Sequence, residues 1–107
     1  MAPQSKASHK QERLRHNAMR ALEEALAAEG DPVFDGLVIR EVVPGRGNAF
    51  IAIVAGAEDA AHQKEAQEAF DTGAGWLRAE VAATLQRRRV PDLTFVVLAP
   101  GVADYRP

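Results

Sequence analysis

The apolar residues of this chain switch twice from helical to extended spacing, and that order limits the folds open to it. From Ser8 to Ala28 they recur about every 3.6 residues. Two β-branched runs follow at 37–43 and 49–54, and the Gly/Pro-rich stretch between them predicts a hairpin. Helical spacing returns from Glu58 to Arg88, and a last extended run covers 94–98. The predicted order is helix, strand, strand, helix, strand.

Local signals predict where these helices begin, end and break. Ser8 is expected to be the N-cap of the first helix, and Gly30 its left-handed C′ residue. The segment Gly73-Ala74-Gly75 interrupts the second helix, and two glycines cost about 1 kcal/mol each relative to Ala. We therefore expect a kink or break there that lets both halves of the helix meet the sheet. Gly73→Ala should be tolerated, whereas Gly75→Ala should destabilise the fold.

Composition indicates one small domain. Of 107 residues, 47% are hydrophobic but 21 are Ala, so the larger apolar side chains suffice for about two layers. We assign the domain to 8–99, a disordered N-terminus to 1–7 and a short tail to 100–107. Because the chain has no Cys, no signal-like segment and no long apolar run, we expect a soluble cytoplasmic protein.

Charge is distributed unevenly along the chain. Residues 1–20 carry a net charge of +4, residues 21–75 carry −8 and residues 76–107 carry +2, for a total of −2. Two basic segments flanking an acidic middle predict one face that binds a polyanion and an opposite face that repels it.

The segment from Ala74 to Val97, AGWLRAEVAATLQRRRVPDLTFVV, resembles the signature of the ribosome-binding factor A family, small KH-type proteins of bacterial small-subunit maturation. Asp31-Pro32 and the run Gly36-Leu37-Val38 resemble that family too. The resemblance implies an α+β, KH-like type II domain (α-β-β-α-kink-α-β). Its three-stranded mixed sheet would have the first strand central and the helices on one face. The glycine segment would replace the GXXG loop of other KH domains.

Eight basic residues are candidates for RNA binding, because RNA affinity depends on neutralising phosphates. The alternative is a solvated helix surface, with the cations at a helix C-terminus favoured by its dipole. The family resemblance favours RNA contact. The candidates are Lys10, Arg13, Arg15, Arg20, Arg78, Arg87, Arg88 and Arg89.

Trp76 directly follows the glycine segment and could stack on an RNA base, but we expect it to pack into the core. Gly73, Ala74 and Gly75 could let a phosphate approach the backbone, although relief of crowding at a bend is the simpler role.

Catalysis and cofactors find no support in the sequence. The histidines at 9, 16 and 62 are too scattered for a metal motif, and no spacing suggests a nucleophile or a dinucleotide site. We predict a non-enzyme without cofactor or metal.

The resulting hypothesis is a monomeric assembly factor that binds 16S rRNA and free 30S subunits and assists late 30S maturation and rRNA processing. The alternative is a KH-like protein–protein interaction module without RNA binding, using the glycine break and the acidic helix from Glu58 to Asp71. Basic residues gathered on one face favour the first, and basic residues split by acidic ones favour the second.

Overall fold

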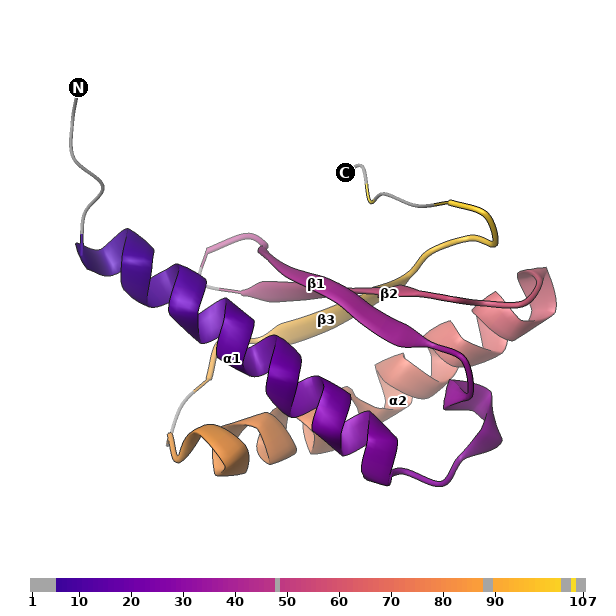
Figure 1. Ribbon diagram of the computed structural model, residues 1–107, viewed down its shortest axis with the longest axis horizontal. Helices are drawn as coiled ribbons and strands as arrows, with labels where there is room; N and C mark the ends of the chain where they lie inside the picture. Colours follow the sequence, from indigo (N-terminus) through magenta and orange to yellow (C-terminus); the bar gives the residue numbers. More distant parts are fainter. Residues whose placement is uncertain (1–5, 48, 88–89, 103–104, 106–107) are drawn as a thin grey trace.

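The computed structural model describes residues 6–47, 49–87, 90–102 and 105, and it has the predicted order of elements (Figure 1). The predicted boundaries hold to within a few residues. In chain order the elements are α1 (Lys6–Ala28), the 3₁₀ turn η1 (Pro32–Phe34), β1 (Val38–Pro44), β2 (Phe50–Ala55), α2 (Ala60–Leu85) and β3 (Leu93–Val97). No helix in the described part of the chain is long and apolar enough to cross a membrane.

The three strands form one mixed sheet in the order β1-β2-β3. β1 and β2 pair antiparallel as a hairpin, and β3 pairs parallel with the other edge of β2. The expectation that the first strand is central is therefore wrong. The crossover through α2 brings β3 beside β2, so that β2 has a neighbour on each side.

Both helices pack on one face of the sheet and form a single core. Residues of β1, β2 and β3 that point to this face lie in the same buried cluster as the apolar stripes of α1 and α2. The predicted helical stripes are confirmed. Those of α1 are Leu14, Ala18, Ala21, Leu22, Ala25 and Leu26, and those of α2 are Ala66, Phe70, Ala74, Leu77, Val81 and Leu85.

The side chains of α2 also bond to the backbone of β3, an outer strand of the sheet. The Gln67 amide donates to the Phe95 carbonyl at 2.8 Å and accepts from the Val97 N–H at 2.8 Å. The Gln63 amide donates to the Val97 carbonyl at 3.0 Å. These bonds occupy polar groups that an outer strand leaves unpaired, and they hold the helix in register with the sheet.

The two ends of α1 differ from the sequence prediction. The helix begins at Lys6, two residues before the predicted N-cap Ser8. Gly30 does not have a positive φ, so it is not a left-handed C′ residue. The chain instead turns into η1, where the Asp31 carboxylate accepts a hydrogen bond from the Val33 N–H at 3.0 Å and Pro32 occupies the first turn.

Of the kink or break expected in the second helix, the break is wrong, because α2 runs uninterrupted from Ala60 to Leu85. Gly73 and Gly75 do not have positive φ, and a Cβ at either position would meet no heavy atom within 4 Å. The buried residues Ala66, Phe70, Leu77 and Val81 keep helical phase across the glycines, so one continuous helix presents the whole stripe to the sheet.

Gly73→Ala and Gly75→Ala should therefore each raise the free energy of unfolding by about 0.5–1 kcal/mol. Both glycines stand in open space within the helix, so alanine adds propensity without a clash. Urea denaturation followed by circular dichroism measures the change. As a control, Gly56→Ala should destabilise, because Gly56 has φ +103° and its added Cβ would collide with the Gly36 carbonyl. A lower free energy of unfolding for Gly75→Ala would instead support the original prediction that the backbone at Gly75 requires a glycine.

Candidate nucleic-acid interface

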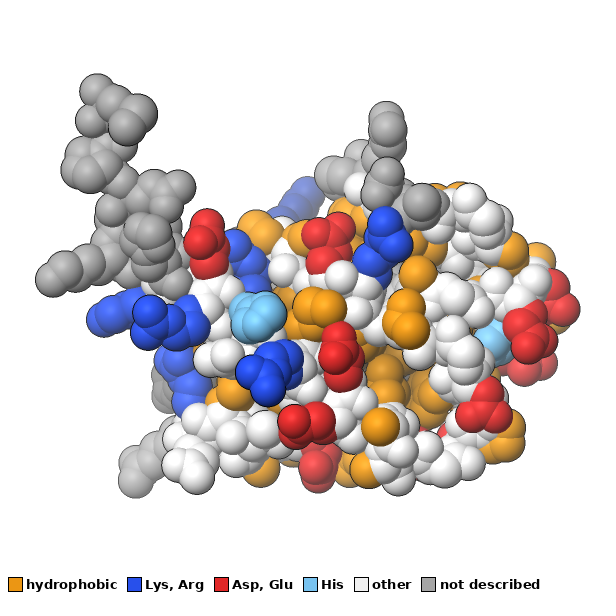
Figure 2. Space-filling view, in the orientation of Figure 1, with side chains coloured by type: hydrophobic (Ala, Val, Ile, Leu, Met, Phe, Trp, Pro, Cys, Tyr) orange, Lys and Arg blue, Asp and Glu red, His pale blue; other side chains and the backbone are white. Residues whose placement is uncertain are grey.

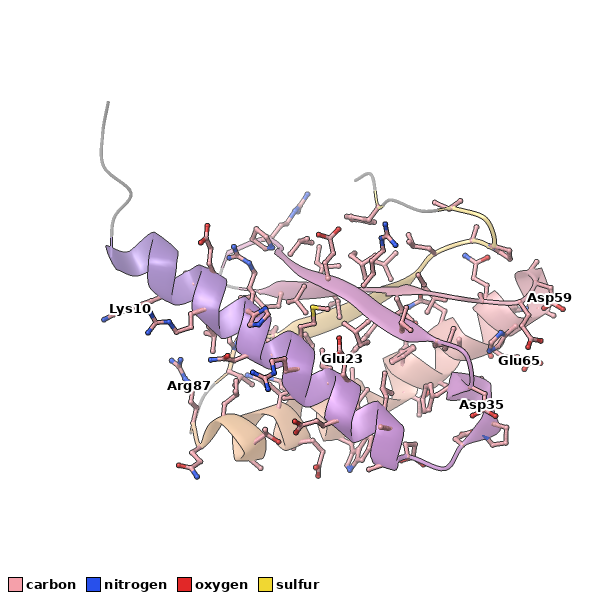
Figure 3. All side chains as sticks on the ribbon, viewed as in Figure 1. Lys10, Glu23, Asp35, Asp59, Glu65 and Arg87 are labelled. Atoms are coloured by element: carbon pink, nitrogen blue, oxygen red, sulfur yellow. The ribbon has the colours of Figure 1, made fainter. Side chains whose placement is uncertain are left out.

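Two basic segments far apart in the sequence meet at one end of the molecule. Lys10 and Arg13 from the early turns of α1 line a shallow groove of about 270 Å³ together with Arg87, which follows α2. Figure 3 shows Lys10 and Arg87 at this same end. The described residues that line the groove include no acidic side chain; the others are Leu14, Asn17 and Leu85. We call this surface the basic groove.

Local structure explains how Arg87 reaches the basic groove. Gln86 adopts a left-handed conformation (φ 55°, ψ 44°) directly after α2. Its N–H and that of Arg87 donate back to the carbonyls of Ala83 and Ala82, at 3.2 and 3.0 Å. This is the pattern of a Schellman cap, which ends the helix and turns the chain. Arg87 is thereby fixed beside the start of α1.

The three cations of the basic groove are exposed, and none forms an ion pair with a described residue. Arg87 stands near the negative end of the α2 dipole, which favours a cation by about 0.3–1 kcal/mol. That explanation does not extend to Lys10 and Arg13, which lie in the second and third turns of α1, far from its C-terminal end. Helix stability alone therefore does not account for this charge pattern.

The remaining predicted RNA-binding residues are arranged differently. Arg78 ties α2 to the segment before β3: its Nε and Nη2 donate to the Val90 carbonyl at 3.3 and 2.8 Å, and Nη2 lies 3.6 Å from Asp92 Oδ1. Arg15 is half-buried and Arg20 exposed on α1, and neither lines the basic groove. Arg88 and Arg89 lie outside the described residues.

Trp76 lies at the surface, so the expectation that it packs into the core is wrong. Its exposed fraction is 45%, whereas the adjacent Leu77 is buried. The stripe of α2 gives the reason: Phe70, Ala74, Leu77 and Val81 are in phase with the core, and position 76 is one residue out of phase. The sequence already contained this signal.

The glycine segment and Trp76 adjoin a second groove, of about 530 Å³, between the end of α1, η1 and α2. Its charged lining residues are all acidic, and we call it the acidic groove. They are Glu29, Asp31, Glu65 and Glu68, beside Gly73 and Trp76. A carboxylate lining repels phosphate, which weakens the case for RNA contact at the glycines.

The basic groove and the acidic groove therefore lie toward opposite ends of the molecule. On the face drawn in Figure 2, Lys and Arg side chains are densest at the end where α1 begins, Asp and Glu dominate the other end, and both kinds lie between them. Lys10 and Arg87 are labelled at the first end in Figure 3, and Asp35, Asp59 and Glu65 at the second. Among the described residues, no group of three or more His, Asp or Glu side chains could hold a metal ion.

Comparison with known proteins identifies the fold. A scan against protein-family models gives no match, and a search of curated proteins gives no significant match. Among solved structures, ribosome-binding factor A from Thermus thermophilus is similar, with a TM-score of 0.69, 25% identity, and coverage of 81% of this chain and 94% of that one.

Two further structures of this kind are similar. A homology model of the T. thermophilus factor (RbfA), fitted into the cryo-EM map of a 30S–RbfA complex, has a TM-score of 0.63 and 26% identity, covering 83% of this chain and 91% of that one. The solution structure of a candidate ribosome-binding factor A from Thermotoga maritima has a TM-score of 0.62 and covers 100% and 99%. At 17% identity, the latter shows the fold alone. The chain is therefore similar to ribosome-binding factor A, whose fold it shares over 81% of its length.

Proposed function

We propose that this protein binds the small (30S) ribosomal subunit by contacting 16S rRNA, and that it assists late maturation and rRNA processing without catalysis. The similarity to a factor fitted into the map of a 30S complex supports the subunit as target. We expect the protein to act as a cytoplasmic monomer.

The basic groove is the observation that carries the RNA contact. Lys10 and Arg13 come from the early turns of α1 and Arg87 follows the end of α2, and the three converge without an acidic neighbour in the groove. Grouped Lys and Arg side chains bind RNA by displacing counterions from phosphates. Arg15 and Arg20 extend the positive charge along α1, and Arg88 and Arg89 extend it in sequence beyond Arg87. Because these basic residues share one groove, the structure favours RNA binding over a protein–protein interaction module that does not bind RNA.

Sedimentation of a cell extract through a sucrose gradient tests the proposal. The protein should travel with free 30S subunits, be depleted from mature 70S ribosomes, and leave the 30S peak as salt is raised, because phosphate contacts are screened. Equal association with mature ribosomes would contradict a role in maturation. A protein that stays at the top of the gradient at low salt would contradict ribosome binding altogether.

A further inference from the structure

The acidic groove combines charge and exposed aromatic surface at the end of the molecule away from the basic groove. Glu29 and Asp31 contribute carboxylates from the loop between α1 and η1, and Glu65 and Glu68 contribute them from α2. No Lys or Arg lines this groove among the described residues. Four carboxylates, two from this loop and two from α2, therefore border one hollow.

Trp76 gives the acidic groove an apolar wall. It lines the groove together with Val33 and Phe34 of η1, which are half-buried, and it leaves 45% of its own surface exposed. Gly73 keeps the groove open next to it, because no heavy atom lies within 4 Å of the place where a Cβ would stand. An indole face bordered by carboxylates suits an arginine or lysine side chain, which pairs with the carboxylate and stacks on the ring.

The walls of this groove are held in place by hydrogen bonds between η1 and the start of α2. His62 Nε2 lies 2.7 Å from the Val33 carbonyl, and His62 Nδ1 accepts from the Glu58 N–H at 3.0 Å. Together these contacts assign the proton to Nε2. The Asp59 carboxylate also accepts from the His62 N–H at 2.7 Å and caps α2. A surface fixed in this way needs little reordering to bind a partner.

The acidic surface continues past the groove toward the start of α2. A neighbouring hollow shares Asp31, Val33 and Glu65 with the acidic groove and adds Asp35, Glu58 and Asp59. The two hollows together offer an acidic track longer than one side chain, which matches an extended polypeptide more closely than a small cation.

We propose that the acidic groove is a docking site for a Lys- and Arg-rich peptide segment of a partner protein. Charge complementarity identifies the occupant: its lining carboxylates attract such a segment and repel a phosphate backbone. One basic side chain lies over Trp76 beside Gly73, and its neighbours pair with Glu65, Glu68 and the carboxylates before η1. This interaction is separate from the proposed RNA contact, which uses the opposite end of the molecule.

Fluorescence anisotropy tests the proposal with a short labelled peptide of alternating Arg and Lys around one Leu. The control peptide carries Glu in place of every Arg and Lys. Only the basic peptide should bind, with an affinity that falls as salt rises. Because Trp76 is the only Trp of the chain, its emission should change as unlabelled peptide saturates the site.

Two matched pairs of variants locate the binding site. Gly73→Leu fills the groove and should weaken binding about tenfold, whereas Gly75→Leu, equally open but outside the lining, should leave it within about twofold. The double variant Glu65→Lys/Glu68→Lys should also weaken binding about tenfold. Glu24→Lys/Glu80→Lys changes the net charge equally, lies outside the acidic groove and should have little effect.

Several results would overturn this proposal. They are no binding of the basic peptide to the native protein, equal losses in both members of each pair, and saturation without any change in Trp76 emission. An rRNA fragment that changes Trp76 emission and loses affinity in Gly73→Leu would make the groove an RNA site. Self-association abolished by Gly73→Leu would make the occupant a second copy. Groove variants should still travel with 30S subunits, so failure here is distinguishable from failure of the proposed function.

Discussion

Replacing Phe70 by Ala should lower the free energy of unfolding by about 3–5 kcal/mol. Phe70 is 0% exposed and stands where α2, η1 and β3 meet. Its ring stacks on Phe95 with centroids 4.7 Å apart and tilts against Phe34 at 5.0 Å. The substitution removes both aromatic contacts and leaves a cavity in a core with few large side chains. Domains of this kind are stabilised by only about 5–15 kcal/mol, so a large share of the stability depends on one ring.

Urea denaturation monitored by circular dichroism measures the loss, and Trp76→Ala is its control. Trp76 lies on the same helix and is larger than Phe70, but its side chain is half exposed. Its replacement should cost less, about 1–2 kcal/mol, because about half of its surface is already exposed to solvent and no enclosed cavity is left behind. Equal losses for the two variants would contradict the assignment of Phe70, rather than Trp76, to the core.

The spacing of apolar residues predicted the helices and strands of this fold well, because that spacing depends on interactions between residues close in sequence. Helical period and β-branched runs placed α1, β1, β2, α2 and β3 to within a few residues. The position of β2 at the centre of the sheet depends instead on the long crossover through α2, which no local pattern encodes. The glycines of α2 mislead for an energetic reason: their propensity cost of about 1 kcal/mol each is smaller than the gain from one unbroken buried stripe.

The sequence predicted the net charge of each segment, but not which basic side chains share one surface in the fold. Arg78 and Arg87 look alike in sequence, yet Arg78 bonds to the Val90 carbonyl while Arg87 lines the basic groove with Lys10. That difference arises from where α2 ends relative to α1, which is a property of packing. The exposed position of Trp76 follows from the helical phase, which here outweighs the general tendency of aromatic residues to be buried.

The double variant Arg13→Gln/Arg87→Gln should bind 30S subunits about 30-fold more weakly at about 0.1 M salt. Both guanidinium groups are exposed, line the basic groove and lack an ion pair with a described residue, so each is free to neutralise a phosphate. Each phosphate contact releases counterions from the RNA, so a variant that loses two contacts releases fewer counterions when it binds. The slope of log affinity against log salt should therefore become shallower by about 1.4–1.8.

Arg46→Gln/Lys64→Gln provides the matched control, because it removes the same charge from exposed positions outside the basic groove. It should leave the salt slope unchanged and reduce affinity within about threefold, since only the long-range attraction of the whole protein is altered. Filter binding or gradient sedimentation at several salt concentrations separates the two effects. A slope that changes equally in both variants would mean that net charge alone holds the protein to RNA. A slope unchanged in both would remove Arg13 and Arg87 from the interface.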